Sequence, residues 1–237
     1  MSVARLAELI RERQPVVALT GAGVSTESGI PDFRSATGIW SRYDPMEYAT
    51  IEAFRRDPRK VWEFYGLRLR VLAEAEPNAA HLALAELERR GLLRAVVTQN
   101  IDTLHERAGS QDVVEVHGSI RTAVCLVDGV RVPRAEVARL VDEHGGAILK
   151  PDVVMFGELL PGREIDRATH LVREARLLLV VGSTLEVWPV AGLPHETLAG
   201  GGAVAIVNRG PTAFDGRAAL KLDAGAGETL QAVVDAL

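Results

Sequence analysis

The sequence predicts an α/β fold: a parallel sheet with helices on both faces, enlarged by a small module made from two insertions. Short apolar runs rich in β-branched residues recur along the chain, and segments with helical periodicity separate several of them. Strands of a parallel sheet are covered on both faces, so they are expected to be apolar throughout. The expected buried strands are residues 16–20, 95–98, 113–117, 177–182 and 203–208.

The first residues predict a helix rather than a targeting segment. Val3, Leu6 and Leu9 or Ile10 stand at helical spacing with charges between them, unlike a signal or transit peptide. The chain has 237 residues, of which 47% are apolar and 25% charged, enough for one good core. Its single cysteine, Cys125, excludes an intrachain disulfide, and a cytoplasmic location is expected.

A glycine-rich segment directly follows the first expected strand. Gly21 and Gly23 would let the backbone turn tightly and approach a pyrophosphate, whose charge the N–H groups of the next helix would meet. The usual fingerprint is Gly-x-Gly-x-x-Gly, and Thr26 stands at the third glycine position, so a plain turn remains an alternative. Residues 25–34 nevertheless continue with a further glycine, a proline, an aromatic and charged residues, which a turn does not need.

Two segments do not fit the alternation of strands and helices. Residues 38–76 contain aromatics and two prolines, and residues 119–150 contain Cys125, a proline and a glycine pair. We expect these insertions to form the small module, and residues 1–37, 77–118 and 151–237 to form the part with the parallel sheet. Ligands of open α/β sheets bind at the carboxyl ends of the strands, so the site is expected there.

Residues 21–34 resemble the signature of the sirtuin family, the NAD-dependent protein deacylases. Four further segments match that family in the same order along nearly the whole chain: residues 98–105, 117–118, 151–158 and 182–185. The resemblance implies a single catalytic domain, residues 1–237, with a Rossmann-like sheet. It also implies NAD as the cofactor and a substrate peptide held in the cleft beneath the small module.

His117 ends an alternating run and is followed by Gly118, so it is expected at a strand end with room beside it. A histidine is about half-charged near pH 6.5 and can accept a proton at neutral pH. Alone, it could equally be a hydrogen-bonded structural residue. The resemblance makes His117 the general base that activates a ribose hydroxyl of NAD.

The segment Gln99-Asn100-Ile101-Asp102 follows the second expected strand. The resemblance implies that Asn100 orients the ribose and a water, while Ile101 and Asp102 line the nicotinamide pocket. Together with His117, Asn100 and Asp102 form the expected catalytic set. Asn100 or Asp102 could also cap a following helix, and both roles are compatible.

The resemblance implies a larger set of NAD-binding residues. Phe33 would lie over the ribose–nicotinamide bond, although it could be an ordinary core aromatic. Arg34 would lie near the diphosphate or ribose, or form a surface ion pair with Asp32. The full expected set is Gly21, Ala22, Gly23, Ser25, Phe33, Arg34, Gln99, Asn100, Ile101, Asp102, Gly182, Ser183, Thr184, Asn208 and Gly227.

Five consecutive residues resemble the extended segment against which the family's substrate peptide pairs as an added strand: Val154, Met155, Phe156, Gly157 and Glu158. Their apolar side chains would form a wall of the tunnel for the acylated lysine. The alternative is a plain core strand.

A helix is expected from Arg59 to about Glu74, and Tyr65 and Arg68 share one of its faces with apolar residues. A desolvated guanidinium needs a partner, so Arg68 either reaches solvent, with Tyr65 in the core, or meets an anion. Tyr-x-x-Arg resembles the sirtuin branch that removes succinyl, malonyl and glutaryl groups and binds the acyl carboxylate with these side chains. Ala49 matches a small residue that widens the pocket of that branch.

One family feature is missing. Most sirtuins bind a structural zinc with two Cys-x-x-Cys pairs, whereas here the four places hold Cys125, Asp128, Val141 and His144. Structural zinc needs four firm ligands and Val141 supplies none, so no zinc is expected. A helix beginning near Pro133 is expected to hold the module together instead.

The sequence therefore predicts an enzyme that removes acyl groups from protein lysines. The resemblance implies that the acyl-lysine oxygen attacks the ribose carbon of NAD, giving nicotinamide, free lysine and O-acyl-ADP-ribose. The alternatives are a deacetylase without acidic-acyl preference, an ADP-ribosyltransferase or NAD hydrolase, and a non-catalytic NAD sensor. With a net charge of −5 and no basic block or long apolar run, neither nucleic acid nor a membrane is an expected partner. A monomer is expected.

Overall fold

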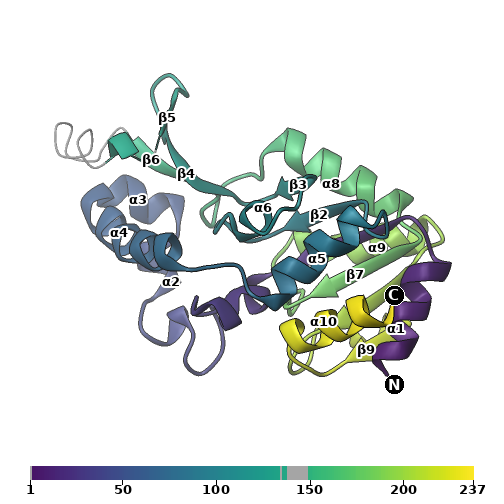
Figure 1. Ribbon diagram of the computed structural model, residues 1–237. Coiled ribbons are helices and arrows are strands. Elements are labelled where there is room, and N and C mark those ends of the chain that lie inside the picture. Colours follow the sequence, from purple (N-terminus) through teal and green to yellow (C-terminus); the bar gives the residue numbers. More distant parts are fainter. Residues whose placement is uncertain (1, 134, 138–148) are drawn as a thin grey trace.

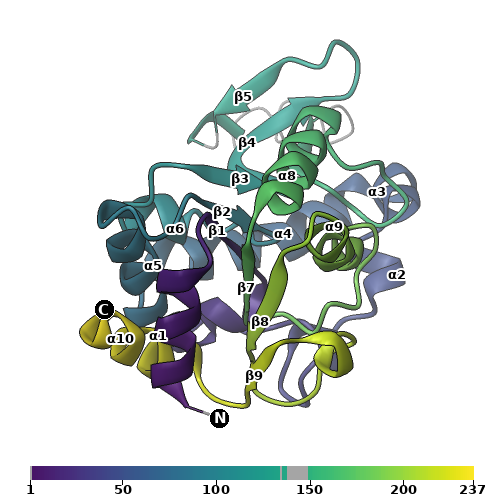
Figure 2. The same cartoon turned by 90° about the vertical axis from the view of Figure 1, so that its right-hand side faces the viewer.

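The computed structural model describes residues 2–133, 135–137 and 149–237 and contains a six-stranded parallel sheet (Figures 1 and 2). Every neighbouring pair of its strands runs parallel. The order is β3 (Val113–Glu115), β2 (Ala95–Thr98), β1 (Val16–Thr20), β7 (Leu177–Val181), β8 (Ala203–Val207) and β9 (Leu220–Leu222). Five of these are the predicted strands; β9 was not predicted, because three residues with a central lysine show no clear strand pattern.

Alternate residues of the strands face two different layers of helices. Val16 and Ala18 pack in the core beneath α1 (Val3–Glu12), α5 (Ala79–Arg89) and α10 (Ala226–Ala236). Val17 and Leu19 pack in the core beneath α8 (Gly162–Glu174) and α9 (Leu193–Ala199). Burial on both faces is why these strands are continuously apolar. The predicted fold class, a Rossmann-like parallel sheet with helices on both faces, is confirmed.

The strand order reverses between β1 and β7. From β1 the chain adds β2 and β3 on one side, and from β7 it adds β8 and β9 on the other. Open parallel sheets bind ligands at such a switch point, outside the carboxyl ends of the strands. The loops that follow β1 and β7 therefore lie side by side where the sequence places two of its motifs.

The two expected insertions lie together beside the main sheet (Figure 1). The first carries α2 (Pro45–Tyr48), α3 (Ile51–Arg56) and α4 (Pro58–Glu74). The second carries an antiparallel sheet with the order β5 (Arg131–Pro133), β4 (Gly118–Cys125) and β6 (Leu149–Val153). Both contribute to a third apolar core, so they form one module.

The ends of the module elements follow local signals. Asp57 caps α4, with its side chain accepting a hydrogen bond from the Lys60 N–H, and Pro58 occupies the first turn. β6 spans the boundary that we expected at residue 151. Val137 is buried in the core of the module. The rest of the segment expected to form a helix from near Pro133 falls outside the described residues.

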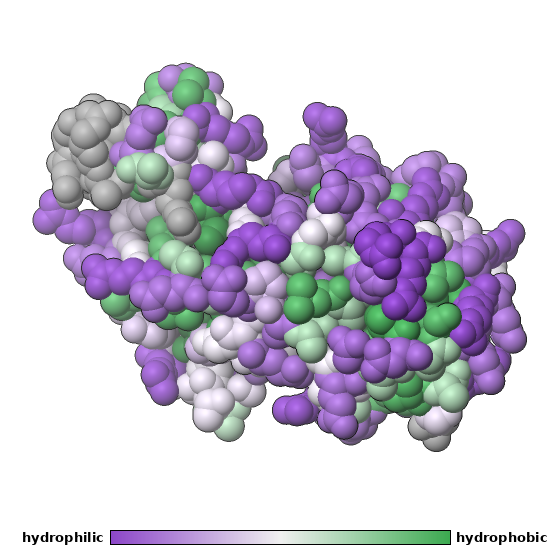
Figure 3. Space-filling model, in the orientation of Figure 1, coloured by the Kyte–Doolittle hydropathy of each residue, from purple (hydrophilic) through white to green (hydrophobic). Residues whose placement is uncertain are grey.

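The remaining elements are short: α6 (Leu104–Arg107) and the 3₁₀ segments η1 (Ala22–Ser28), η2 (Ile39–Ser41), η3 (Val190–Gly192) and η4 (Asp215–Arg217). No helix within the described ranges is long and apolar enough to cross a bilayer. On the face drawn in Figure 3, hydrophilic residues predominate and apolar residues form small groups.

Candidate active site

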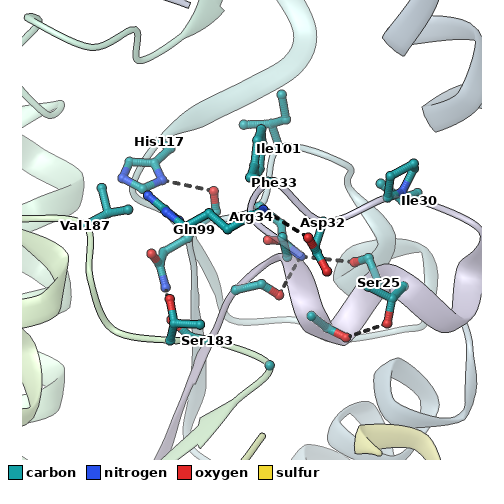
Figure 4. A pocket seen from close by; sticks show the side chains of 18 of the residues that line it. Ser25, Ile30, Asp32, Phe33, Arg34, Gln99, Ile101, His117, Ser183 and Val187 are labelled. Carbon is teal, nitrogen blue, oxygen red and sulfur yellow. Dashed lines mark hydrogen bonds between the residues drawn. The ribbon is translucent and has the colours of Figure 1, made fainter. Parts of the chain in front are cut away.

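A cavity of about 1170 Å³ lies between the small module and the carboxyl edge of the parallel sheet. Its lining comes from both parts of the molecule, including the loops after β1, β2, β7 and β8 and the helix α4. Every site residue predicted from the sequence except Gly227 lines this cavity. Figure 4 shows its central part, with His117 and Gln99 at the left, Phe33 in the middle and Ser25 at the right.

The glycines of the two loops at the switch point allow their backbones to touch. The Gly23 N–H donates to the Gly182 carbonyl at 2.9 Å, and the Gly21 N–H donates to the Val181 carbonyl at 3.1 Å. Gly182 has φ of +62°, and a Cβ at this position would lie 2.2 Å from the backbone nitrogen of Val24. No side chain fits there, so the glycines let the two loops pack directly against each other at the floor of the cavity.

The protonation of His117 follows from its hydrogen bond. Nδ1 lies 3.0 Å from the Gln99 carbonyl oxygen, which can only accept, so Nδ1 carries the proton (Figure 4). Nε2 of the neutral ring therefore has a free lone pair. Burial lowers the pKa of His117, and the Gln99 hydrogen bond opposes this shift only partly. His117 is therefore neutral at pH 7 and able to accept a proton through Nε2.

Ser25 connects three polar side chains beneath the cavity. Its hydroxyl donates to Asp102 Oδ2 at 2.7 Å and accepts from Asn100 Nδ2 at 3.0 Å. His81 Nε2 lies 3.3 Å from the same hydroxyl, and the backbone N–H of Asn78 donates to His81 Nδ1. Since Nδ1 accepts, Nε2 carries the proton and donates to Ser25.

His81 is a site residue that the sequence analysis missed. It is fully buried, and this burial lowers its pKa to about 4 despite the opposing charge of Asp102. The signal was present but unusual: Asn78 is the N-cap of α5, and His81 occupies the position where a capping box normally has Glu or Gln.

Asp102 holds the start of α6, as one of its two expected roles requires, while its expected role in the nicotinamide pocket stays a prediction. Its Oδ2 accepts from Ser25, and its Oδ1 accepts the Leu104 N–H at the start of α6. Asn100 donates to the Gly21 carbonyl as well as to Ser25. The two polar residues after β2 are thus tied to the glycine loop after β1.

Phe33 and Arg34 lie at the mouth of the cavity. Asp32 does not pair with the Arg34 guanidinium; its Oδ1 accepts the backbone N–H groups of Arg34 and Ser35. The Arg34 side chain lies 3.7 Å from Glu186 and is partly exposed. It therefore remains available to an anion in the cavity, because an exposed pair of this kind is weak.

The opposite end of the cavity is formed by the loops after β7 and β8. Ser183 accepts a hydrogen bond from Gln99 Nε2 at 2.9 Å, and Asn208 is almost completely buried. Thr184 also lines the cavity. Gly227 lies in the first turn of α10, where its N–H donates to Glu27, and the neighbouring residues 224–226 line the cavity; its expected contact with NAD stays a prediction.

The segment expected to receive the substrate peptide is already paired on one side. The Phe156 N–H donates to the Ala49 carbonyl at 2.8 Å, and the Phe156 carbonyl accepts from the Ile51 N–H at 3.0 Å. Met155 is buried, whereas the Phe156 side chain is partly exposed. The segment is therefore held against the first insertion, with its remaining side facing the cavity.

Tyr65 and Arg68 of α4 line the same cavity, and so does Ala49. The Arg68 guanidinium lies 4.8 Å from the centre of the Phe33 ring and 5.7 Å from that of Phe64. Its Nη1 is buried without a hydrogen-bond partner among the described residues. Burial lowers the pKa of Arg68 and raises that of Tyr65 to about 12.

Comparisons with known proteins match this site and fold. The Sir2 family model matches residues 21–189. The chain belongs to the Sir2 family. The NAD-dependent protein deacylase of Pyrococcus furiosus is 42% identical over 97% of this chain and 96% of its own length. The NAD-dependent protein deacetylase of Sulfurisphaera tokodaii is 43% identical over 99% and 96%, respectively.

Two solved Sir2 structures have the same architecture as this sirtuin. One holds a p53 peptide and NAD+; it is 37% identical, covers 99% of this chain and 98% of its own, and has a TM-score of 0.90. The other holds a deacetylated p53 peptide and 3'-O-acetyl ADP-ribose, with 37% identity, the same coverage and a TM-score of 0.93. The enzyme class predicted from the motifs, an NAD-dependent protein deacylase, is thereby confirmed.

The residues of this sirtuin fit NAD. The cavity is larger than the pockets of most small ligands, as an extended dinucleotide with a peptide side chain requires. His117 presents a free ring nitrogen at one part of the wall, and the glycine loops exclude side chains from the floor. At two of the places that hold zinc ligands in most sirtuins, Asp128 accepts from the Val130 N–H and the Cys125 thiol. Val141 and His144 lie outside the described residues.

Proposed function

We propose that this sirtuin removes acidic acyl groups, namely succinyl, malonyl or glutaryl, from protein lysines, with deacetylation as a weaker activity. The observation that carries this proposal is the Arg68 guanidinium, which lines the cavity with one buried nitrogen unpartnered by any described residue. A buried cation without an anionic partner is costly, so a function that supplies the anion accounts for its presence.

The surroundings of Arg68 support a carboxylate ligand. The Phe33 and Phe64 rings flank the guanidinium and shield it from water, which strengthens its interaction with an anion. Tyr65 keeps its hydroxyl proton at neutral pH, since its pKa is raised to about 12, and can donate to the same anion. A planar guanidinium fork and a phenol hydroxyl match the two oxygens of an acyl carboxylate.

The other residues of the cavity provide the chemistry of acyl removal. Bound NAD would supply an electrophilic ribose carbon and nicotinamide as the leaving group. His117 Nε2 can accept a proton from a hydroxyl placed within hydrogen-bond distance, and Gln99 holds the ring in that tautomer. Ser25, Asn100 and Asp102 form a fixed polar wall. Holding the reactants in line in such a site lowers the barrier by reducing the entropy cost.

The test compares succinyl-, malonyl- and acetyl-lysine peptides of one sequence, each with NAD, on wild-type protein and Arg68→Met. We expect kcat/KM for the acidic peptides to fall roughly 10- to 100-fold in Arg68→Met, because hydrogen bonds to a charged group are lost. Acetyl turnover should change much less. Arg70→Met is the matched control, because Arg70 lies two residues along α4 and is exposed.

Two outcomes would contradict the proposal. Equal losses of succinyl and acetyl turnover in Arg68→Met would show that Arg68 supports the site in general. Release of free ADP-ribose or ADP-ribosylated protein, seen by mass spectrometry in place of O-acyl-ADP-ribose, would favour an NAD hydrolase or ADP-ribosyltransferase. Thermal unfolding provides a second readout: removal of an unpaired buried charge should leave the Tm unchanged or raise it.

We also propose that the small module of this sirtuin needs no zinc. Among the described residues no three His, Cys, Asp or Glu side chains form a group that could hold a metal. Val137 packs in the same apolar core as helices of the first insertion, which supports cohesion by burial. Elemental analysis of purified protein should find far less than one zinc per chain, and a chelator should leave Tm and turnover unchanged. Stoichiometric zinc would refute the proposal.

A further inference from the structure

We infer that Lys150 is a specificity-determining residue: its ammonium group neutralises Glu158 in the wall of the acyl cavity, so that an acidic acyl group is not repelled. This inference rests on the proposed preference for acidic acyl groups. Lys150 lies outside the sequence motifs and takes no part in the proposed acyl-removal chemistry.

Lys150 is a buried lysine with a complete set of partners. Its side chain is only 6% exposed. Nζ donates to the carbonyls of Pro151 at 3.0 Å and Val153 at 2.6 Å and to Glu158 Oε2 at 2.9 Å. Three acceptors match the three N–H bonds of an ammonium group. Lysine is almost never so buried unless it is paired, and here three acceptors fix the position of the ammonium group.

Glu158 brings the partner charge to the cavity. It lines the cavity together with Tyr65 and Arg68, and its Oε2 accepts the Met155 N–H at 2.8 Å in addition to Lys150. Glu158 and Tyr65 face the same cavity; burial raises the pKa of Tyr65, Arg68 opposes this rise, and the charge of Glu158 adds to it. Without Lys150, Glu158 would present an uncompensated negative charge to any substrate carboxylate in the cavity.

The consequence depends on the charge of the acyl group. An acetyl group is neutral and would be unaffected by the charge of Glu158. A succinyl carboxylate bound to Arg68 and Tyr65 would be repelled by an uncompensated Glu158. Electrostatic interactions between partly buried charges are weakly screened, so the pair Lys150–Glu158 should matter for acidic substrates only. A purely structural role in shaping residues 154–157 would instead affect all peptides alike.

The experiment measures kcat/KM for succinyl and acetyl peptides on each variant and takes their ratio. Lys150→Met should lower the succinyl-to-acetyl ratio by about tenfold, equivalent to about 1.4 kcal/mol. Lys150→Arg should keep the ratio near that of the wild type, since the charge is retained. Lys150→Met combined with Glu158→Gln should restore the ratio, even where the overall turnover is lower.

A second variant, which should change the succinyl-to-acetyl ratio in the opposite direction, keeps the inference testable if Lys150→Met does not fold. Glu158→Gln alone leaves the ammonium uncompensated and should raise the succinyl-to-acetyl ratio. An unchanged ratio in Lys150→Met or in Glu158→Gln, or a double variant that fails to restore it, would overturn the inference. The proposed function fails separately, if wild-type protein does not favour succinyl peptides or if Arg68→Met leaves the ratio unchanged.

Discussion

Removal of the Ser25 hydroxyl is the sharpest test of the polar network beneath the cavity. Ser25 is almost completely buried, and Ser25→Ala removes one donor and one acceptor without adding volume. The hydroxyl makes three hydrogen bonds, to Asp102, Asn100 and His81. The variant therefore leaves three polar groups to find other partners.

The expected cost follows from what each group can do instead. Asn100 keeps the Gly21 carbonyl, and Asp102 lines the cavity, where water can replace the hydroxyl. His81 is fully buried, and its Nε2–H has no such substitute. An unsatisfied buried polar group costs about 1–3 kcal/mol, so the unfolding free energy should fall by roughly 2–3 kcal/mol.

Urea unfolding followed by circular dichroism measures this loss as a shift of the midpoint at unchanged m-value. Ser28→Ala is the matched control in the same 3₁₀ segment. Ser28 accepts one hydrogen bond from Asn78, whose Nδ2 also donates to the Val24 carbonyl. The control should lose less than about 1 kcal/mol. If Ser25→Ala were no less stable than Ser28→Ala, the network would not contribute as described.

Two further predictions concern histidines. His117→Asn should lower kcat by a factor of roughly 10² to 10⁴ while the Tm changes little, because the base is lost from a partly exposed position; wild-type turnover in this variant would exclude His117 as the base. His81 and His105 are buried, and desolvation lowers their pKa values to about 4 and about 3. Below pH 6.5 these two histidines take up protons in the unfolded chain but not in the folded protein. Their burial therefore costs no stability above pH 6.5, and the free energy of unfolding decreases as the pH falls toward 4. A Tm that stays constant from pH 7 to pH 4.5 would contradict this reasoning.

The strands of the parallel sheet could be predicted because their signal is local. Residues 16–20, 95–98 and 177–181 are apolar except for the last residues Thr20 and Thr98, and burial on both faces of the sheet requires this composition. Helix α4 was equally visible from its periodicity. β9 and the start of α10 carry weaker signals, which is why β9 was not predicted and why Gly227 was placed in the cavity lining, next to the residues 224–226 that do line it.

The residues of the candidate site that lie within sequence motifs could be predicted. Contacts between residues that are distant in the sequence could not. The order of the motifs identified His117, Asn100 and Asp102, but no pattern placed His81 beside Ser25. Ser25 and His81 are 56 positions apart in the sequence, and their contact depends on how α5 packs on the sheet. Likewise, the motif Tyr-x-x-Arg showed that Arg68 shares a face with Tyr65, without showing what that face meets.

The sequence by itself determined the fold class, the family and the positions of the chemical groups along the chain, because periodicity and motif spacing are properties of neighbouring residues. Only the tertiary structure decided which groups became partners. It left Arg68 Nη1 buried without a partner among the described residues, and it paired Lys150 with Glu158 in the wall of the cavity. The physical reason is that the desolvation and hydrogen bonding of a side chain depend on all the atoms within a few ångströms of it. Those atoms come from distant segments of the chain and are brought together only when the cores pack.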